Sequence, residues 1–132
     1  MAEILTSITT NKARQKLAKA HYDGTVVPKV IKAGWGTGGV DSNGAVIQPD
    51  PSLVQVAGEI IKNDIKSSTL SQDGLSVIFV AELNPGESGV LDKKISSVGL
   101  YDADSDLILI KNFTSKQMDA DSKISIECTE EF

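Results

Sequence analysis

The sequence predicts an α+β fold in which one N-terminal helix packs on a mainly antiparallel β-sheet or sandwich of about five to six strands with a long glycine-rich loop. Aromatic residues make up only 5% of the 132 residues, so valine and isoleucine carry most of the packing, which favours strands. One segment near the N-terminus has helical spacing, and the later apolar runs are short and bounded by turn residues. We therefore expect one domain over 1–132, with an N-terminal arm at 1–9 and a tail at 130–132 that frays.

The helix is predicted from Lys12 to Tyr22. Thr9, Thr10 and Asn11 offer N-cap oxygens before it, and Gly24 suits its C-terminal end. The residues at helical spacing on the apolar face are Ala13, Leu17, Ala20 and Tyr22.

The opposite face of this helix is basic, carrying Lys12, Arg14, Lys16 and Lys19. A basic face permits a nucleic-acid interpretation. However, the net charge of the chain is −5, whereas nucleic acids and anionic membranes both select basic surfaces. We expect a solvated helix face and no nucleic-acid partner. No apolar run approaches the length that spans a bilayer, so membrane insertion is not expected either.

A strand with an early proline is predicted over Val26–Trp35, followed by an irregular loop, GWGTGGVDSNGAVIQPDP. Five glycines and two prolines lie in this loop, from Gly34 to Pro51, and loops this long in small domains are usually functional or disordered. The glycines resemble a phosphate cradle only superficially, because no Lys-Ser/Thr pair and no helix follow them. We expect a partner to dock here, with core packing as the alternative role for the tryptophan. The candidate docking residues are Trp35, Gly36, Gly38, Gly39, Val40, Val46 and Ile47.

The segment Ser52–Lys66 is ambiguous between helix and strand. Its apolar residues follow helical spacing, but Gly58 weakens a helix, and Asp73-Gly74 is a hairpin signal that requires a strand before it. We expect one helical turn followed by a strand over Ile60–Leu70. The next strand, Leu75–Leu83, is expected to be mostly covered on both faces.

The structural centre of the chain is predicted to be a buried hairpin. Two apolar runs, Ile95–Tyr101 and Leu107–Ile110, flank the polar turn Asp102–Asp106. The last strand, Lys123–Thr129, alternates cleanly, and its inward residues are Ile124, Ile126 and Cys128.

The residues needed for catalysis or for zinc binding are scarce. The chain has one histidine, His21, on the charged helix face, and one cysteine, Cys128, inside a strand. Nucleophilic catalysis needs a nucleophile with an adjacent base, and zinc needs several cysteine or histidine ligands. We therefore expect no enzyme activity and no cofactor.

The sharpest candidate for a metal site is the acidic turn, in which Asp102, Asp104 and Asp106 copy the first three ligand positions of a calcium loop. Leu107 stands at the sixth position, which requires glycine, and Phe113 at the twelfth, which requires glutamate. We expect a tight acidic turn. A glycan- or calcium-binding β module is the alternative function.

Four segments, taken in order, carry a family resemblance. ITTNKARQKLAKAHYDG (Ile8–Gly24) looks like the opening T-x-x-G-x-x-x-L-A-x-A-x-x-x-G of the phage tail-collar fibre family, and VIKAGWGTGG (Val30–Gly39) resembles its strand and glycine-rich turn. PDPSLVQVAGEI (Pro49–Ile60) is similar to its proline-rich turn. ISSVGLYDADSDLILIKNF (Ile95–Phe113) is similar to its signature I-x-E-x-G-L-[YF]-D-A-D-G-x-L-I. The resemblance covers residues 8–113.

This family is the N-terminal baseplate-attachment domain of phage tail fibre proteins. The resemblance implies a structural component of a phage, prophage or phage-tail-like particle that docks at the baseplate, anchors or positions tail fibres, and forms a homo-oligomer, often a trimer. Its partners would be baseplate and tail fibre proteins, and it would be made in the bacterial cytoplasm without a signal peptide. In this sequence Ser97 stands where the signature has glutamate, and Ser105-Asp106 replaces the glycine of the turn and its neighbour.

Overall fold

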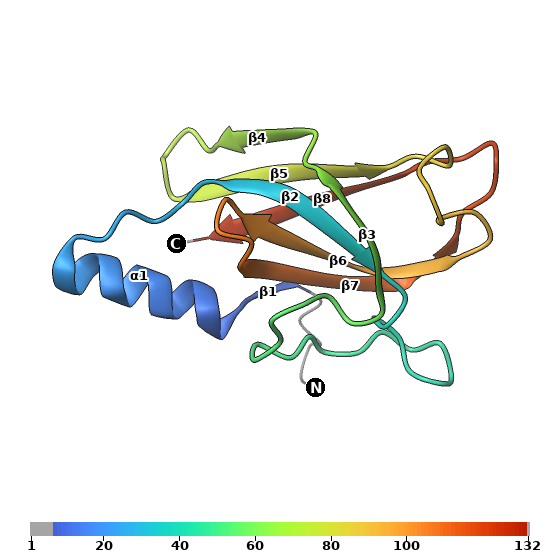
Figure 1. Cartoon of the computed structure of the whole chain (residues 1–132), viewed down its shortest axis with the longest axis horizontal. Helices are drawn as coiled ribbons and strands as arrows, with labels where there is room; N and C mark the ends of the chain where they lie inside the picture. Colours follow the sequence, from blue (N-terminus) through green and yellow to red (C-terminus); the bar gives the residue numbers. More distant parts are fainter. Residues whose placement is uncertain (1–6, 132) are drawn as a thin grey trace.

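The computed structural model describes residues 7–131, which form one helix and two antiparallel sheets (Figure 1). The larger sheet has the strand order β1-β7-β6-β2-β3, and the smaller has the order β4-β5-β8. The elements of the larger sheet are β1 (Ser7–Thr9), β2 (Val30–Gly36), β3 (Glu59–Asp64), β6 (Lys94–Asp102) and β7 (Leu107–Gln117). The remaining elements are α1 (Asn11–Asp23), β4 (Ser67–Leu70), β5 (Ser76–Leu83) and β8 (Ile124–Glu131).

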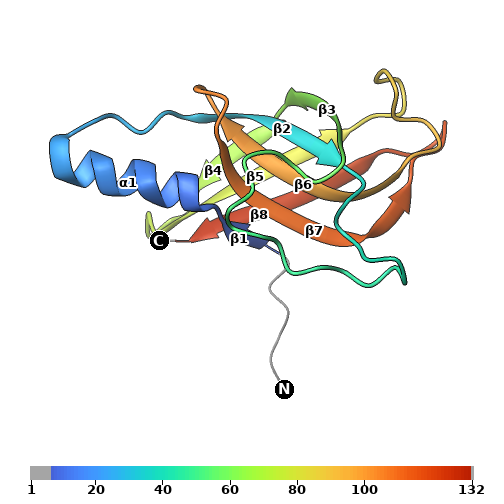
Figure 2. The ribbon, with the colours of Figure 1, turned by 60° about the horizontal axis from the view of Figure 1, so that its bottom comes forward.

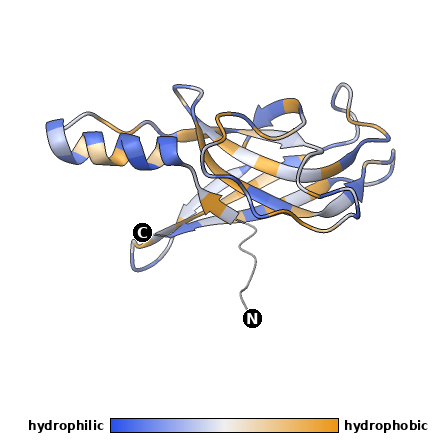
Figure 3. Ribbon diagram, turned by 90° about the horizontal axis from the view of Figure 1, so that it is seen from below, coloured by the Kyte–Doolittle hydropathy of each residue, from blue (hydrophilic) through white to orange (hydrophobic). Residues whose placement is uncertain are grey.

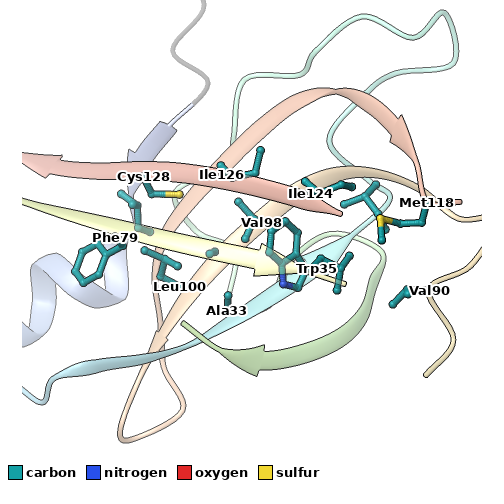
Figure 4. Close-up of a cluster of buried hydrophobic side chains, with 14 residues drawn as sticks. Ala33, Trp35, Phe79, Val90, Val98, Leu100, Met118, Ile124, Ile126 and Cys128 are labelled. Carbon is teal, nitrogen blue, oxygen red and sulfur yellow. The ribbon is translucent and has the colours of Figure 1, made fainter. Parts of the chain in front are cut away.

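The two sheets face each other across one hydrophobic core (Figure 4). Trp35, Val98 and Leu100 enter it from the larger sheet, and Phe79 and Ile126 enter it from the smaller. Burial of such side chains stabilises the fold by about 1.5–3 kcal/mol each. The mostly β architecture with one N-terminal helix is therefore confirmed in its coarse outline, and the described residues form eight strands where the sequence predicted five to six.

The hairpin β6–β7 occupies the centre of the larger sheet, as predicted. Every residue of β6 after Lys94 is buried, and β6 lies between β7 and β2. The first four residues of β7 are buried as well, as expected for an apolar run covered on both faces.

The region from Ser52 to Leu70 differs from its prediction. Residues 51–58 form turns, and the expected helical turn is absent among them, partly because Gly58 adopts a left-handed conformation with φ of 65°. The expected single strand Ile60–Leu70 is two strands in different sheets, and the chain crosses between them at Ile65 and Lys66. Alternation predicts a strand but does not predict which sheet it joins.

The helix α1 does not pack along a sheet as predicted. It has no buried residue, and its apolar side chains are exposed by 42% at Leu17 and 91% at Tyr22. Figures 1 and 2 show α1 extending beyond one end of the two sheets, and Figure 3 shows its mixed hydropathy there. The predicted apolar face of α1 therefore does not enter the core.

The start of α1 is fixed to the body of the fold. Thr10 is fully buried, caps the helix by accepting a hydrogen bond from the Ala13 backbone N–H, and donates its hydroxyl to the Leu107 carbonyl at 2.6 Å. Gly24 ends the helix in the left-handed conformation, as predicted. The cap and the stop were thus both predictable from the sequence.

Both chain ends form strands where they are described. Ser7–Thr9 pairs with β7, while the rest of the predicted arm lies outside the described residues. Glu130 and Glu131 of β8, which were expected to fray, pair with Val77 and Ser76 of β5. The tail prediction was wrong at these two positions because β8 continues for two residues beyond its predicted end at Thr129. Phe132 lies outside the described residues.

Candidate functional site

The turn between β6 and β7 gathers three carboxylates around one lysine. Asp102 builds the turn itself, because its Oδ1 accepts hydrogen bonds from the backbone N–H groups of Asp104 and Asp106 at 3.0 and 3.1 Å. The ammonium of Lys16, from α1, lies 2.6 Å from Asp102 Oδ2, 3.1 Å from Asp104 Oδ2 and 2.7 Å from Asp106 Oδ2. The side chain of Asp102 is fully buried. The acidic turn therefore holds the second turn of α1.

A lysine ammonium thus occupies the place that a calcium ion would take between these carboxylates. Their ligand oxygens lie within 4.8 Å of one another, which is a spacing that a metal ion could use. Burial lowers the pKa of Lys16, but its hydrogen bonds to Asp102, Asp106 and Asp104 outweigh burial and raise that pKa well above its usual range. The lysine stays charged at neutral pH, and its single positive charge offsets part of the negative charge of the turn.

The residues predicted for docking in the glycine-rich loop divide into a buried part and an exposed part. Trp35 is fully buried in the core, and its indole N–H donates to Asn63 Oδ1 at 3.0 Å. Trp35 therefore packs in the core, which is the alternative role that the sequence left open. Gly36 belongs to β2, and a Cβ on it would overlap the carbonyl of Ala57. These two residues cannot contact a partner in this conformation.

Gly38 and Gly39 serve close packing. The Gly38 N–H bonds to the Ala57 carbonyl at 3.0 Å, and a Cβ at Gly38 would come within 2.6 Å of the Ala57 Cβ. The Gly39 N–H donates to Ser96 Oγ at 2.8 Å, and a Cβ there would overlap the Ser96 carbonyl. The glycines of this segment therefore let it lie against the strands.

The rest of the predicted loop is a small turn on the surface. Val40 and Val46 form an antiparallel bridge, and Asp41 Oδ1 accepts from the Asn43 and Ala45 backbone N–H groups. Ile47, exposed by 40%, is the large apolar side chain available there. We define the docking turn as Val40–Ile47.

A second feature is a groove beside α1 that the sequence did not predict. It has a volume of about 690 Å³ and lies between α1, β1, the segments 27–30 and 48–51, and the end of β8. Five of its lining residues are large and apolar: Ile8, Leu17, Val27, Val30 and Ile108. We call this feature the helix groove.

Glu130 of β8 lines the helix groove with an unpaired carboxyl. Its side chain follows the inward set of β8, and the residue is 9% exposed. Its Oε2 is buried and has no hydrogen-bond partner among residues 7–131, and burial raises the pKa of the carboxyl. A buried polar atom left without a partner costs about 1–3 kcal/mol, so Glu130 is retained at a cost to stability.

Replacing Glu130 with glutamine is expected to stabilise the protein by about 1 kcal/mol at neutral pH. Because the folded state raises the pKa of Glu130, its contribution to stability is complete below its ordinary pKa of 4.5 and is lost as the pH rises through the folded value. Urea unfolding of both proteins at several pH values should therefore show little difference at about pH 4 and a growing one towards about pH 7. A difference that is independent of pH would contradict this assignment.

The histidine and the cysteine that were considered for catalysis lie on different elements, α1 and β8. Cys128 is buried in β8, and burial raises the pKa of its thiol to about 11, so the thiolate needed for attack is scarce at neutral pH. His21 lies exposed in the last turn of α1. The core position predicted for Cys128 is confirmed.

No family model, curated protein or solved structure matches this chain. Within residues 7–131, the helix is too short and too polar to cross a membrane. The functional interpretation therefore depends on the sequence signature and on the surfaces described above.

Proposed function

We propose that the protein is a structural component of a phage, prophage or phage-tail-like particle, and that it docks at the baseplate and anchors or positions tail fibres as a homotrimer. Its work in this role is binding to baseplate and fibre proteins, without catalysis or a cofactor. The docking turn Val40–Ile47 is the exposed part of the loop in which the sequence predicts a partner contact, and it is the surface proposed here for that contact.

The observation that carries the proposal is the Ile95–Phe113 hairpin, which bears the family signature. It forms the centre of the larger sheet, as expected of a segment that defines a fold. Ser105, at the signature's glycine position, has φ of 66°. This left-handed conformation favours glycine, so the local geometry gives a physical reason for the glycine of the signature.

The outward position of α1 and the exposed apolar residues near it also support a docking role. Val26 is 84% exposed and Val27 46% exposed, directly after the exposed end of the helix. Neighbouring apolar side chains that remain in water favour an interaction site over a solvated surface.

Replacing Ile47 with aspartate is expected to lower recovery of the protein in assembled particles by about tenfold, which corresponds to roughly 1.4 kcal/mol of binding free energy. The reason is that a charge replaces the apolar side chain of the docking turn. The measurement is co-purification after co-expression with baseplate and tail fibre proteins from the same genome.

The matched control is Leu70→Asp, which places the same charge on the exposed strand β4 of the other sheet, where Leu70 is 65% exposed. The control should assemble like the wild type, and both variants should keep the wild-type melting temperature within about 2 °C. Equal recovery of the Ile47 variant and the wild type would exclude the docking turn as the contact. If the wild type itself fails to co-purify, the particle assignment is wrong.

A further inference from the structure

We propose that the helix groove binds an extended segment of a protein partner that presents a lysine or arginine between apolar side chains, with the cation paired to Glu130. The groove offers apolar walls and one buried acid at its side. This inference rests on the proposed docking function and adds to it a second surface and the chemistry of its ligand.

The unpaired oxygen of Glu130 is what points to a ligand. Backbone pairing to Val77 fixes the strand at this residue, so the side chain is held on the inward face with Ile126 and Cys128. No described hydrogen-bond donor reaches Oε2. A buried carboxylate of this kind is stabilised by a cation or a donor that comes with a ligand.

The charges around the groove favour a cationic ligand. Glu131 lines the same end, so two acids lie next to each other along β8. Of the basic residues that line the groove, Lys16 is already held by the three aspartates of the acidic turn. Arg14 lies exposed at the helix side, and its side chain makes no ion pair within residues 7–131. Arg14 thus lines the same groove without pairing to Glu130, and the buried oxygen of Glu130 is left for a ligand cation.

The walls of the groove favour apolar side chains on both sides of that cation. Leu17 and Val27, which both line it, remain 42% and 46% exposed. Covering them would add a hydrophobic contribution of roughly 25 cal/mol for each Å² removed from water. A segment of the form apolar–Lys–apolar can therefore cover the apolar walls of the groove and pair its ammonium with Glu130.

The probes are three blocked tripeptides, acetyl-Leu-Lys-Leu-amide and its analogues with norleucine or glutamate in the middle. They are titrated into the intact ¹⁵N-labelled protein, and amide shifts are followed by NMR at about pH 7. The lysine peptide should bind at least about fivefold more tightly than the norleucine peptide, with shifts at β1, β8 and α1. The glutamate peptide should bind most weakly.

Two variants test the assignment of the cation to its partner. Glu130→Gln should remove the preference for lysine over norleucine while leaving the norleucine affinity within about twofold. Arg14→Ala should strengthen lysine-peptide binding, because it removes a like charge from the lining of the groove. The stability gain expected for Glu130→Gln means that loss of folding does not confuse the comparison.

Three outcomes would overturn the inference. They are tighter binding of the glutamate peptide, a lysine preference that survives in Glu130→Gln, and groove shifts caused by self-association of the chain without peptide. Since these titrations use no baseplate or fibre protein, they can fail while co-purification succeeds, and the two proposals are distinguishable.

Discussion

Replacing Lys16 with alanine is expected to lower the free energy of unfolding by about 3 kcal/mol. The substitution leaves the fully buried carboxylate of Asp102 facing Asp104 and Asp106 without a cation. Breaking one side of a buried ion pair is costly because the other charge stays in the protein interior. Urea unfolding at neutral pH measures the loss, and the amide spectrum should show the second turn of α1 released.

Lys19→Ala is the matched control on the same helix. The Lys19 side chain is 64% exposed, and within residues 7–131 its one ion pair is with Asp23, one helical turn away, so its removal should cost less than about 0.5 kcal/mol. Equal losses in the two variants would show that the acidic turn does not hold the helix.

Calcium provides a second readout for the same cluster. With the ammonium gone, three carboxylates at metal-binding spacing are available, and about 10 mM calcium should recover roughly 1 kcal/mol in Lys16→Ala if the dissociation constant is near millimolar. The wild type should not respond. A wild type that calcium stabilises equally would restore the calcium-binding interpretation of this turn.

Replacing Gly39 with alanine is expected to destabilise the protein by about 3 kcal/mol, the upper end of the usual cost of overpacking. The new methyl group would overlap the backbone carbonyl of Ser96. Backbone cannot give way as a flexible side chain can, and the Gly39 N–H bond to Ser96 Oγ would be strained as well. Thermal and urea unfolding measure the effect.

Gly44→Ala is the control in the same loop. Nothing lies within 4 Å of a Cβ at Gly44, although its φ of 81° adds a conformational cost of about 1 kcal/mol. A larger loss of stability in Gly39→Ala than in Gly44→Ala would show that close packing, more than backbone freedom, is the role of the glycines. A larger loss at Gly44 would mean that this segment does not lie against β6 as described.

The sequence predicted those features whose signals are local. The cap and stop of α1, the central hairpin and the alternation of β8 all depend on spacing within a few residues, and all are present. The strand at Ile60–Leu70 was predicted but not its division, because a switch between sheets depends on contacts far along the chain.

The candidate sites depended on longer-range contacts. Lys16 and Asp102 are separated by 86 positions, and nothing local marks them as partners. The buried indole of Trp35 donates its N–H to Asn63 of β3, a partner 28 positions away that the sequence around Trp35 does not reveal. These contacts exist only once the strands are ordered into sheets.

The inward position of Glu130 could have been predicted from the sequence. The inward set of the last strand was read as Ile124, Ile126 and Cys128, and one further step of two residues places an acid on the same face. Composition suggested a solvated tail there. Periodicity, extended past the last apolar residue, was the better guide.

The way in which α1 is held has a mechanical consequence. Its attachments are at Thr10 and Lys16, whereas Tyr22 lies six residues beyond the second of them, about 9 Å at the rise of an α-helix. A force applied sideways at Tyr22 therefore acts as a torque about Lys16, with the helix as the lever. The load falls first on the ion pairs of the acidic turn, which would yield before any strand of the sandwich is pulled.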